Sequence, residues 1–210
     1  MQRIIDRFGP LAGAASFLLS FVVWIAVTGG IPPEVGTSSA GEVVGFWTDQ
    51  GDATTAISGL TAVFGAILIL VFGAWLSTTM RDRGATALAA TAGMGTLMIA
   101  MGLVIDGTIG FILGDEAASL PVESVLALSA MTEYLFLPYL LGLVLIMVSV
   151  GASATQTGLV PSWLARAGYV AAIVALIPHE VAFVGIMLAM LWMLVAGIVM
   201  FRGAGTSAPA

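Results

Sequence analysis

Long apolar segments are the feature of this sequence that most constrains its fold. They cover roughly residues 10–28, 56–79, 85–105, 129–150, 162–177 and 181–201. A bilayer core is about 30 Å thick, and a helix needs about 20 apolar residues to cross it. Only 9% of the 210 residues are charged, far below the share of about 25% in soluble domains. The sequence therefore predicts an all-α membrane protein. Its six transmembrane helices form one domain, residues 1–202, followed by a short disordered tail, residues 203–210.

The distribution of basic residues predicts the orientation of these helices. The chain has no lysine, and its six basic residues are Arg3, Arg7, Arg81, Arg83, Arg166 and Arg202. With six spans, all of these arginines fall on the same side of the membrane. The positive-inside rule then places both termini in the cytoplasm. The formal net charge of −6 disfavours nucleic acid as a partner.

The first outer loop carries the signature of a short amphipathic helix. Ser39 and Glu42 have the spacing of a capping box. Val43 and Trp47 follow, four residues apart, so that a helix would place both on one face. We expect this helix to lie in the outer interface. It could be a lid that covers helix ends, or a gate over an outer site.

Four ionisable residues are predicted to lie at one depth near the outer edge of the membrane. At about 1.5 Å per residue, Asp106, Glu133 and Glu180 lie about 26 to 31 Å from the inner ends of their helices. His179 precedes Glu180. Ionisable groups near hydrocarbon are costly and point to function, such as cation or proton binding. Asp106, His179 and Glu180 could instead cap helix ends, and Glu133 could make a structural hydrogen bond.

Pro138 adds a polar feature beside Glu133. A proline inside a helix clashes with the carbonyl four residues back, which here belongs to Tyr134. We expect a kink at this point, with the hydroxyls of Tyr134 and Tyr139 nearby. The set of Asp106, Glu133, His179 and Glu180 would also have the chemistry of a divalent-metal site, although no dense ligand spacing supports one.

Several absences narrow the function. Without cysteine there is no disulfide, Cys-ligated zinc or iron–sulfur cluster. Without lysine there is no retinal Schiff base, and one histidine cannot provide bis-histidine haem ligation. No P-loop or G-x-S-x-G motif is present. We therefore predict no cofactor and no enzymatic activity.

Pairs of small residues four apart occur in three of the apolar segments. They are Gly9 with Gly13, Ala89 with Gly93, and Gly185 with Ala189. Such pairs let helix backbones approach closely in lipid. They could pack helices within the chain, or form a seam with a partner subunit or a second copy. The bilayer itself is the predicted surrounding partner.

Three segments carry a resemblance to known proteins. They are EVVGFWTD at residues 42–49, PSWLAR at 161–166 and LWMLVAGIV at 191–199. In these segments and in the order of its features, the chain resembles a class of bacterial six-helix integral membrane proteins of unknown function. The resemblance implies a six-helix bundle in the bacterial cytoplasmic (inner) membrane. It implies no catalytic residue.

Two functions compete on this evidence, with a membrane enzyme ranked last. The first is a multi-pass accessory or binding protein whose acidic outward-facing site holds a partner subunit, a lipid or a cation. The second is a small proton- or cation-linked transporter or channel that uses Glu133. A continuous polar path from the outer site to the arginines would favour the second.

Overall fold

Helices account for most of this protein. The computed structural model describes residues 2–177 and 180–204, and 85% of the described chain is helical. No strand occurs in these two ranges. The prediction of an all-α chain is therefore confirmed. Five helical segments are long and apolar enough to cross a membrane: Arg7–Thr28, Asp52–Asp82, Thr86–Glu116, Val122–Thr157 and Val184–Gly203.

The first long segment combines three helical elements. Helix α1 (Gln2–Phe17) passes into a π-helical turn, η1 (Leu18–Val23), and then into α2 (Trp24–Thr28). It ends at Gly29, whose φ of 75° lies in the left-handed region that glycine tolerates. A π-helical turn widens the helix locally and is frequent at functional sites.

Helices α4 (Asp52–Asp82) and α5 (Thr86–Glu116) form the longest hairpin. Each has 31 residues, hence a length of about 46 Å, which exceeds a hydrocarbon core of about 30 Å. The helix does not end with the apolar segment 85–105, because α5 continues to Glu116. The additional turns bury Ile109 and Leu113 against other helices, and this packing sustains the helix beyond the apolar segment.

Helices α6 (Val122–Tyr134) and α7 (Phe136–Thr157) run almost end to end. The interruption is at Leu135, whose amide bonds to the carbonyls of Met131 and Thr132. Pro138 lacks the amide that would pair with the Tyr134 carbonyl. The predicted disturbance beside Glu133 is therefore present, as a break between two helices.

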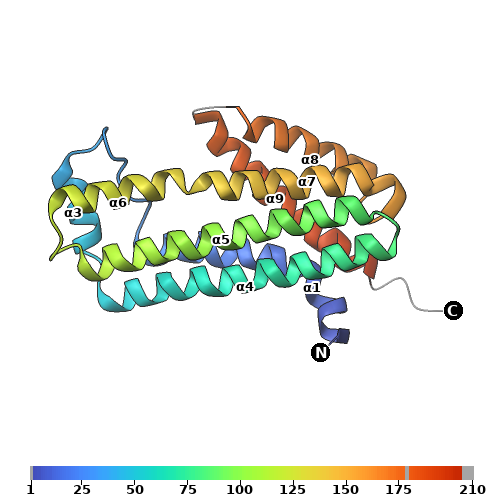
Figure 1. Ribbon diagram of the computed structural model, residues 1–210, viewed down its shortest axis with the longest axis horizontal. Helices are drawn as coiled ribbons and strands as arrows, with labels where there is room; N and C mark the ends of the chain where they lie inside the picture. Colours follow the sequence, from blue (N-terminus) through green and yellow to red (C-terminus); the bar gives the residue numbers. More distant parts are fainter. Residues whose placement is uncertain (1, 178–179, 205–210) are drawn as a thin grey trace.

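Helices α8 (Ser162–Ala175) and α9 (Glu180–Ala204) complete the chain. At 14 residues, α8 is about 21 Å long, shorter than a membrane core. The pair lies beside the part of α7 that is distant from α3 (Ala40–Thr48) (Figure 1). Helix α9 includes Gly203 and Ala204, which the sequence assigned to the tail, and helix ends commonly vary by one or two residues. The rest of the predicted disordered tail lies outside the described residues.

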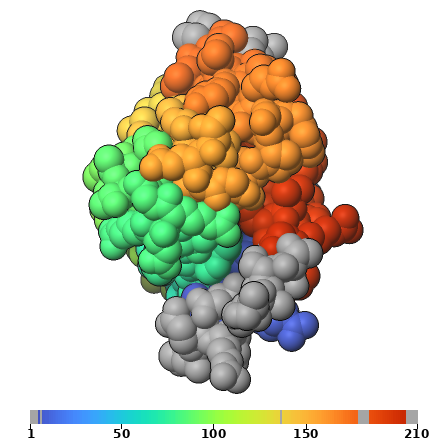
Figure 2. All heavy atoms as spheres, turned by 90° about the vertical axis from the view of Figure 1, so that its right-hand side faces the viewer, coloured from blue at the N-terminus to red at the C-terminus, as the bar shows by residue number. Residues whose placement is uncertain are grey.

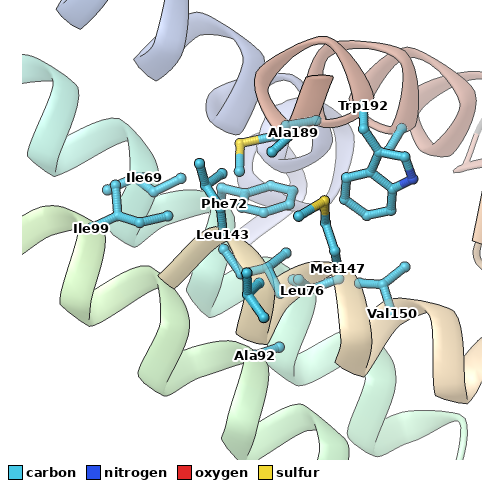
Figure 3. Packing of buried hydrophobic residues seen from close by; sticks show 14 of the residues in the cluster. Ile69, Phe72, Leu76, Ala92, Ile99, Leu143, Met147, Val150, Ala189 and Trp192 are labelled. Carbon is cyan, nitrogen blue, oxygen red and sulfur yellow. The ribbon is translucent and has the colours of Figure 1, made fainter. Parts of the chain in front are cut away.

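The long helices close into a ring. Around the ring, α1 packs on α4, α4 on α5, α5 on α7, α7 on α8, α8 on α9, and α9 packs back on α1. The middle of the ring is filled at one level by large buried side chains (Figure 3). Phe72 and Leu76 of α4, Met147 of α7 and Trp192 of α9 are all at most 4% exposed. This level forms a dry, close-packed core.

Glycines allow α5 and α7 to cross closely. A Cβ atom added at Gly142 would lie 2.5 Å from the carbonyl oxygen of Gly95. Among the predicted small-residue pairs, Gly9 packs against Trp75 and Gly185 against Ala175. These two glycines therefore pack within the chain, which is one of the two interpretations of the pattern.

The two ends of the bundle differ in character. Helix α3 lies at one end, and the α4–α5 turn lies at the other (Figure 1). Figure 2 looks onto the second end, where this turn meets the α7–α8 connection and the last part of α9. There Arg83 donates from Nη1 to the carbonyl of Thr157 at 2.5 Å. Arg81 lies in the last turn of α4, Arg166 in α8 and Arg202 in the last part of α9. We therefore call this the arginine end.

Candidate functional site

Helix α3 is built as the sequence predicts. The Ser39 amide donates to Glu42 at 2.8 Å and the Glu42 amide donates to the Ser39 hydroxyl at 3.3 Å, which completes the capping box. The hydrogen bond from the Ser39 amide is the main cause of a lowered Glu42 pKa. Val43 and Trp47 are 0% and 4% exposed. They are turned toward the protein, so the predicted helix and its buried face are confirmed.

The buried face of α3 docks on the C-terminal part of α5 and on the N-terminal part of α6. Val43 and Trp47 pack in one apolar cluster with Leu113 and Val125. The Trp47 indole donates from Nε1 to the Ser129 hydroxyl at 2.8 Å, and Ser129 is 1% exposed. We call α3 the lid, because it covers the end of a cavity that Trp47 also lines.

This cavity of about 460 Å³ lies inside the ring of helices. Its walls come from the α1–η1–α2 segment and from α4, α5, α6, α7 and α9. Most of the lining is apolar, and α9 supplies Met187, Met190 and Met193. Asp106 and Glu133 also line it, together with several hydroxyl groups. Residues from distant parts of the chain thus line one shared space.

Asp106 lies in the interior of α5, and the expectation that it could cap a helix end is wrong. The helix continues past it to Glu116, so its neighbours' backbone groups are already paired along the helix. Its side chain is half-buried and faces the cavity. The Tyr139 hydroxyl of α7 donates to its Oδ2 at 3.4 Å. Asp106 therefore joins α5 to α7 in the cavity wall.

Glu133 lies at the end of α6 and also faces the cavity. Its Oε1 accepts a hydrogen bond from the backbone amide of Val35. Val35 belongs to the loop that joins α2 to the lid. Glu133 therefore connects the cavity to the segment that carries the lid. The structural hydrogen bond expected for it was to a neighbouring helix, whereas the observed donor is a loop amide.

The other predicted site residues are placed differently. Tyr134 is 67% exposed and does not share the cavity with Glu133. Successive residues of a helix point about 100° apart, so the two side chains face different ways. His179 lies outside the described residues. Glu180 begins α9, and its side chain also lies outside the described part. Within that part, no group of three His, Cys, Asp or Glu residues could hold a metal.

Two buried hydroxyls in the cavity wall are features that the sequence reasoning missed. Ser20 lies in η1 and Thr55 in the second turn of α4, and both line the cavity. Neither hydroxyl oxygen has a hydrogen-bond partner among the described residues. Thr55 is only 5% exposed. Serine and threonine are common in membrane helices, so no sequence signal distinguishes these two.

The opposite end of the cavity is closed. Ile69, Ile99 and Leu143 line it there, and all three belong to the apolar core drawn in Figure 3. Beyond them lie the fully buried Leu76 and Met147. No polar side chain in the described lining continues the cavity toward the arginine end.

The site is thus a cavity with two carboxylates, a mainly apolar lining and a docked helix, α3, that supplies Trp47 to its wall. Comparisons of the chain with protein-family models, with curated proteins and with solved structures found no match.

Proposed function

We propose that this chain is a membrane-embedded binding protein that holds a lipid-like molecule in its cavity. One observation carries the proposal: a single cavity of about 460 Å³ combines apolar walls with two carboxylates. Ligand sites commonly measure about 300 to 1,000 Å³, are mainly apolar and contain a few placed polar groups. A molecule with a hydrocarbon part and a polar head would match both kinds of lining.

The proposed setting is the bacterial cytoplasmic membrane, with six spans and both termini in the cytoplasm. Five long apolar helices support this arrangement, with α8 and its apolar flanks as the remaining span. The arginine end would face the cytoplasm under the positive-inside rule. Helices α4 and α5 exceed the hydrocarbon core by about 16 Å. The lid would then lie at or beyond the outer interface.

Binding fits this cavity better than transport through it. A proton- or cation-linked transporter using Glu133 would need a polar route to the arginine end. Ile69, Ile99 and Leu143 instead close the cavity on that side, and fully buried side chains follow. A polar route through this region would have to disrupt the packed core. Such a disruption is costly, because protein interiors are packed to crystal-like density.

Photoaffinity labelling tests the proposal. The purified protein in lipid nanodiscs is irradiated with increasing amounts of a dodecanol that carries a diazirine, and labelled peptides are identified by mass spectrometry. We expect saturable labelling of cavity-lining peptides, such as the α9 segment around Met190. The variant Gly110→Phe should abolish it, because Gly110 lines the cavity and its Cβ position is open.

The matched control is Val104→Phe on the same helix. Val104 is 47% exposed and is not part of the cavity lining. This variant should label like the wild type. Labelling that never saturates, or that survives in Gly110→Phe, would show that the cavity does not hold the probe and would overturn the proposal.

A further inference from the structure

The charge of the cavity is unbalanced. Asp106 and Glu133 both face into it, and no arginine is among the described residues that line it. The chain contains no lysine at all. Buried carboxylates are normally paired with a cation or fully hydrogen-bonded, because desolvating an isolated charge is costly. While both groups are ionised, a positive partner for them would come from outside the described lining.

The hydrogen bonds at the two carboxylates leave most of their acceptor capacity unused. Within the described chain, Asp106 accepts from Tyr139 at 3.4 Å and Glu133 accepts from the Val35 amide. An ionised carboxylate can accept about four hydrogen bonds. Both groups can therefore accept several further donors from a molecule in the cavity.

The buried hydroxyls of Thr55 and Ser20 are a second unusual feature of the cavity wall. Both oxygens lack a partner within the described residues, although both residues line the cavity. Thr55 is only 5% exposed. Unsatisfied buried polar groups are rare in native proteins and require an explanation.

The rest of the lining suits an organic cation better than a metal ion. Phe17, Phe21 and Trp24 also line the cavity, and aromatic faces attract ammonium groups. The three methionines of α9 can adapt to an alkyl chain. A volume of about 460 Å³ is also much larger than a single bare ion needs.

From these observations we propose that the cavity selects amphiphiles with a positively charged ammonium head. The head pairs with Asp106 and Glu133, and the hydrocarbon part lies against the aromatic and methionine side chains. This inference rests on the proposed binding function and specifies its ligand class. An ammonium group supplies up to three donors to the unused acceptors.

Three probes with one tail test the charge preference. Dodecylamine, dodecanol and dodecanoic acid, each with a diazirine at the same tail carbon, are compared by saturation labelling in nanodiscs of zwitterionic lipid at neutral pH. We expect the amine to reach half-saturation at about 10- to 100-fold lower concentration than the alcohol, the range for hydrogen bonds to charged groups. The acid should label least, because it would face two like charges.

Variants assign the preference to the cavity carboxylates. Asp106→Asn keeps the shape of the side chain. In this variant the half-saturation concentration of the amine should come within about twofold of that of the alcohol. Labelling by the alcohol should not change. Asp115→Asn is the matched control, since it removes a carboxylate from an exposed position on the same helix. It should keep the full amine preference. If Asp106→Asn is not monodisperse on size exclusion, Glu133→Gln takes its place with the same expectation.

The outcomes separate this inference from the proposed function. Saturable labelling by the alcohol with no preference for the amine would overturn the ammonium class and leave binding by the cavity intact. An equal loss of preference in Asp106→Asn and Asp115→Asn would also overturn it, because the effect would then be general surface charge. Absence of saturable labelling by all three probes would overturn both proposals.

Discussion

Removing the hydrogen bond between Trp47 and Ser129 should release the lid while the bundle stays folded. The variant Trp47→Phe keeps an aromatic ring in the pocket but loses the indole donor, which bonds to Ser129 at 2.8 Å. Ser129 is 1% exposed, so water cannot replace the lost donor. A buried hydroxyl left without its partner costs about 1 to 3 kcal/mol.

This cost should appear in the local opening of α3. The lid is a nine-residue helix, and its side chains Val43 and Trp47 hold it through the small apolar cluster at the ends of α5 and α6. A loss of about 1 to 3 kcal/mol corresponds to about 5- to 150-fold faster exchange of amides that exchange through local opening. Hydrogen–deuterium exchange with mass spectrometry measures this on the peptide that covers α3.

Amides of the buried core of α4, around Phe72, are the internal control and should exchange at the wild-type rate. The double variant Trp47→Phe/Ser129→Ala should exchange more slowly than the sum of the single effects predicts, because neither partner is then left unpaired. Unchanged exchange in α3 would refute the role of this hydrogen bond. A parallel increase in the α4 core would show that the whole bundle, not the lid, had loosened.

Three further predictions follow from packing, charge and orientation. Gly142→Ala should lower the stability measured by thermal unfolding in detergent by about 1 to 3 kcal/mol, because its Cβ would lie 2.5 Å from a facing backbone carbonyl oxygen. Gly110→Ala is the control. Its Cβ position is open, so it should raise this stability by about 0.5 to 1 kcal/mol. The pKa of Glu42 is lowered, so its capping contribution to stability is complete above the ordinary pKa of 4.5 and is lost as pH falls through the lowered pKa. An NMR titration of the Glu42 carboxyl with a midpoint at the ordinary value would contradict this prediction. A cysteine at Thr37 should react with an impermeant thiol reagent outside intact cells and one at Asp82 should not, and the reverse pattern would overturn the orientation.

The helices and their local ends could be predicted because they depend on residues close in sequence. Apolar runs of about 20 residues imply membrane-length helices, and five of the six expected spans correspond to such helices. The capping box of Ser39 and Glu42 needs only a spacing of three residues. The break beside Glu133 needs only Pro138, which removes one amide from its own helix.

The site depended on contacts between helices that are distant in sequence. Helix α5 passes Asp106 because Ile109 and Leu113 are buried against the lid and α6, which the composition of the segment does not reveal. Tyr139 reaches Asp106 across the α5–α7 interface, while Tyr134 points outward. The cavity exists because helices from distant parts of the chain surround a space that their side chains leave unfilled. Local patterns determine which segments become helices, whereas an interior space depends on which faces meet, and only the packed chain decides that.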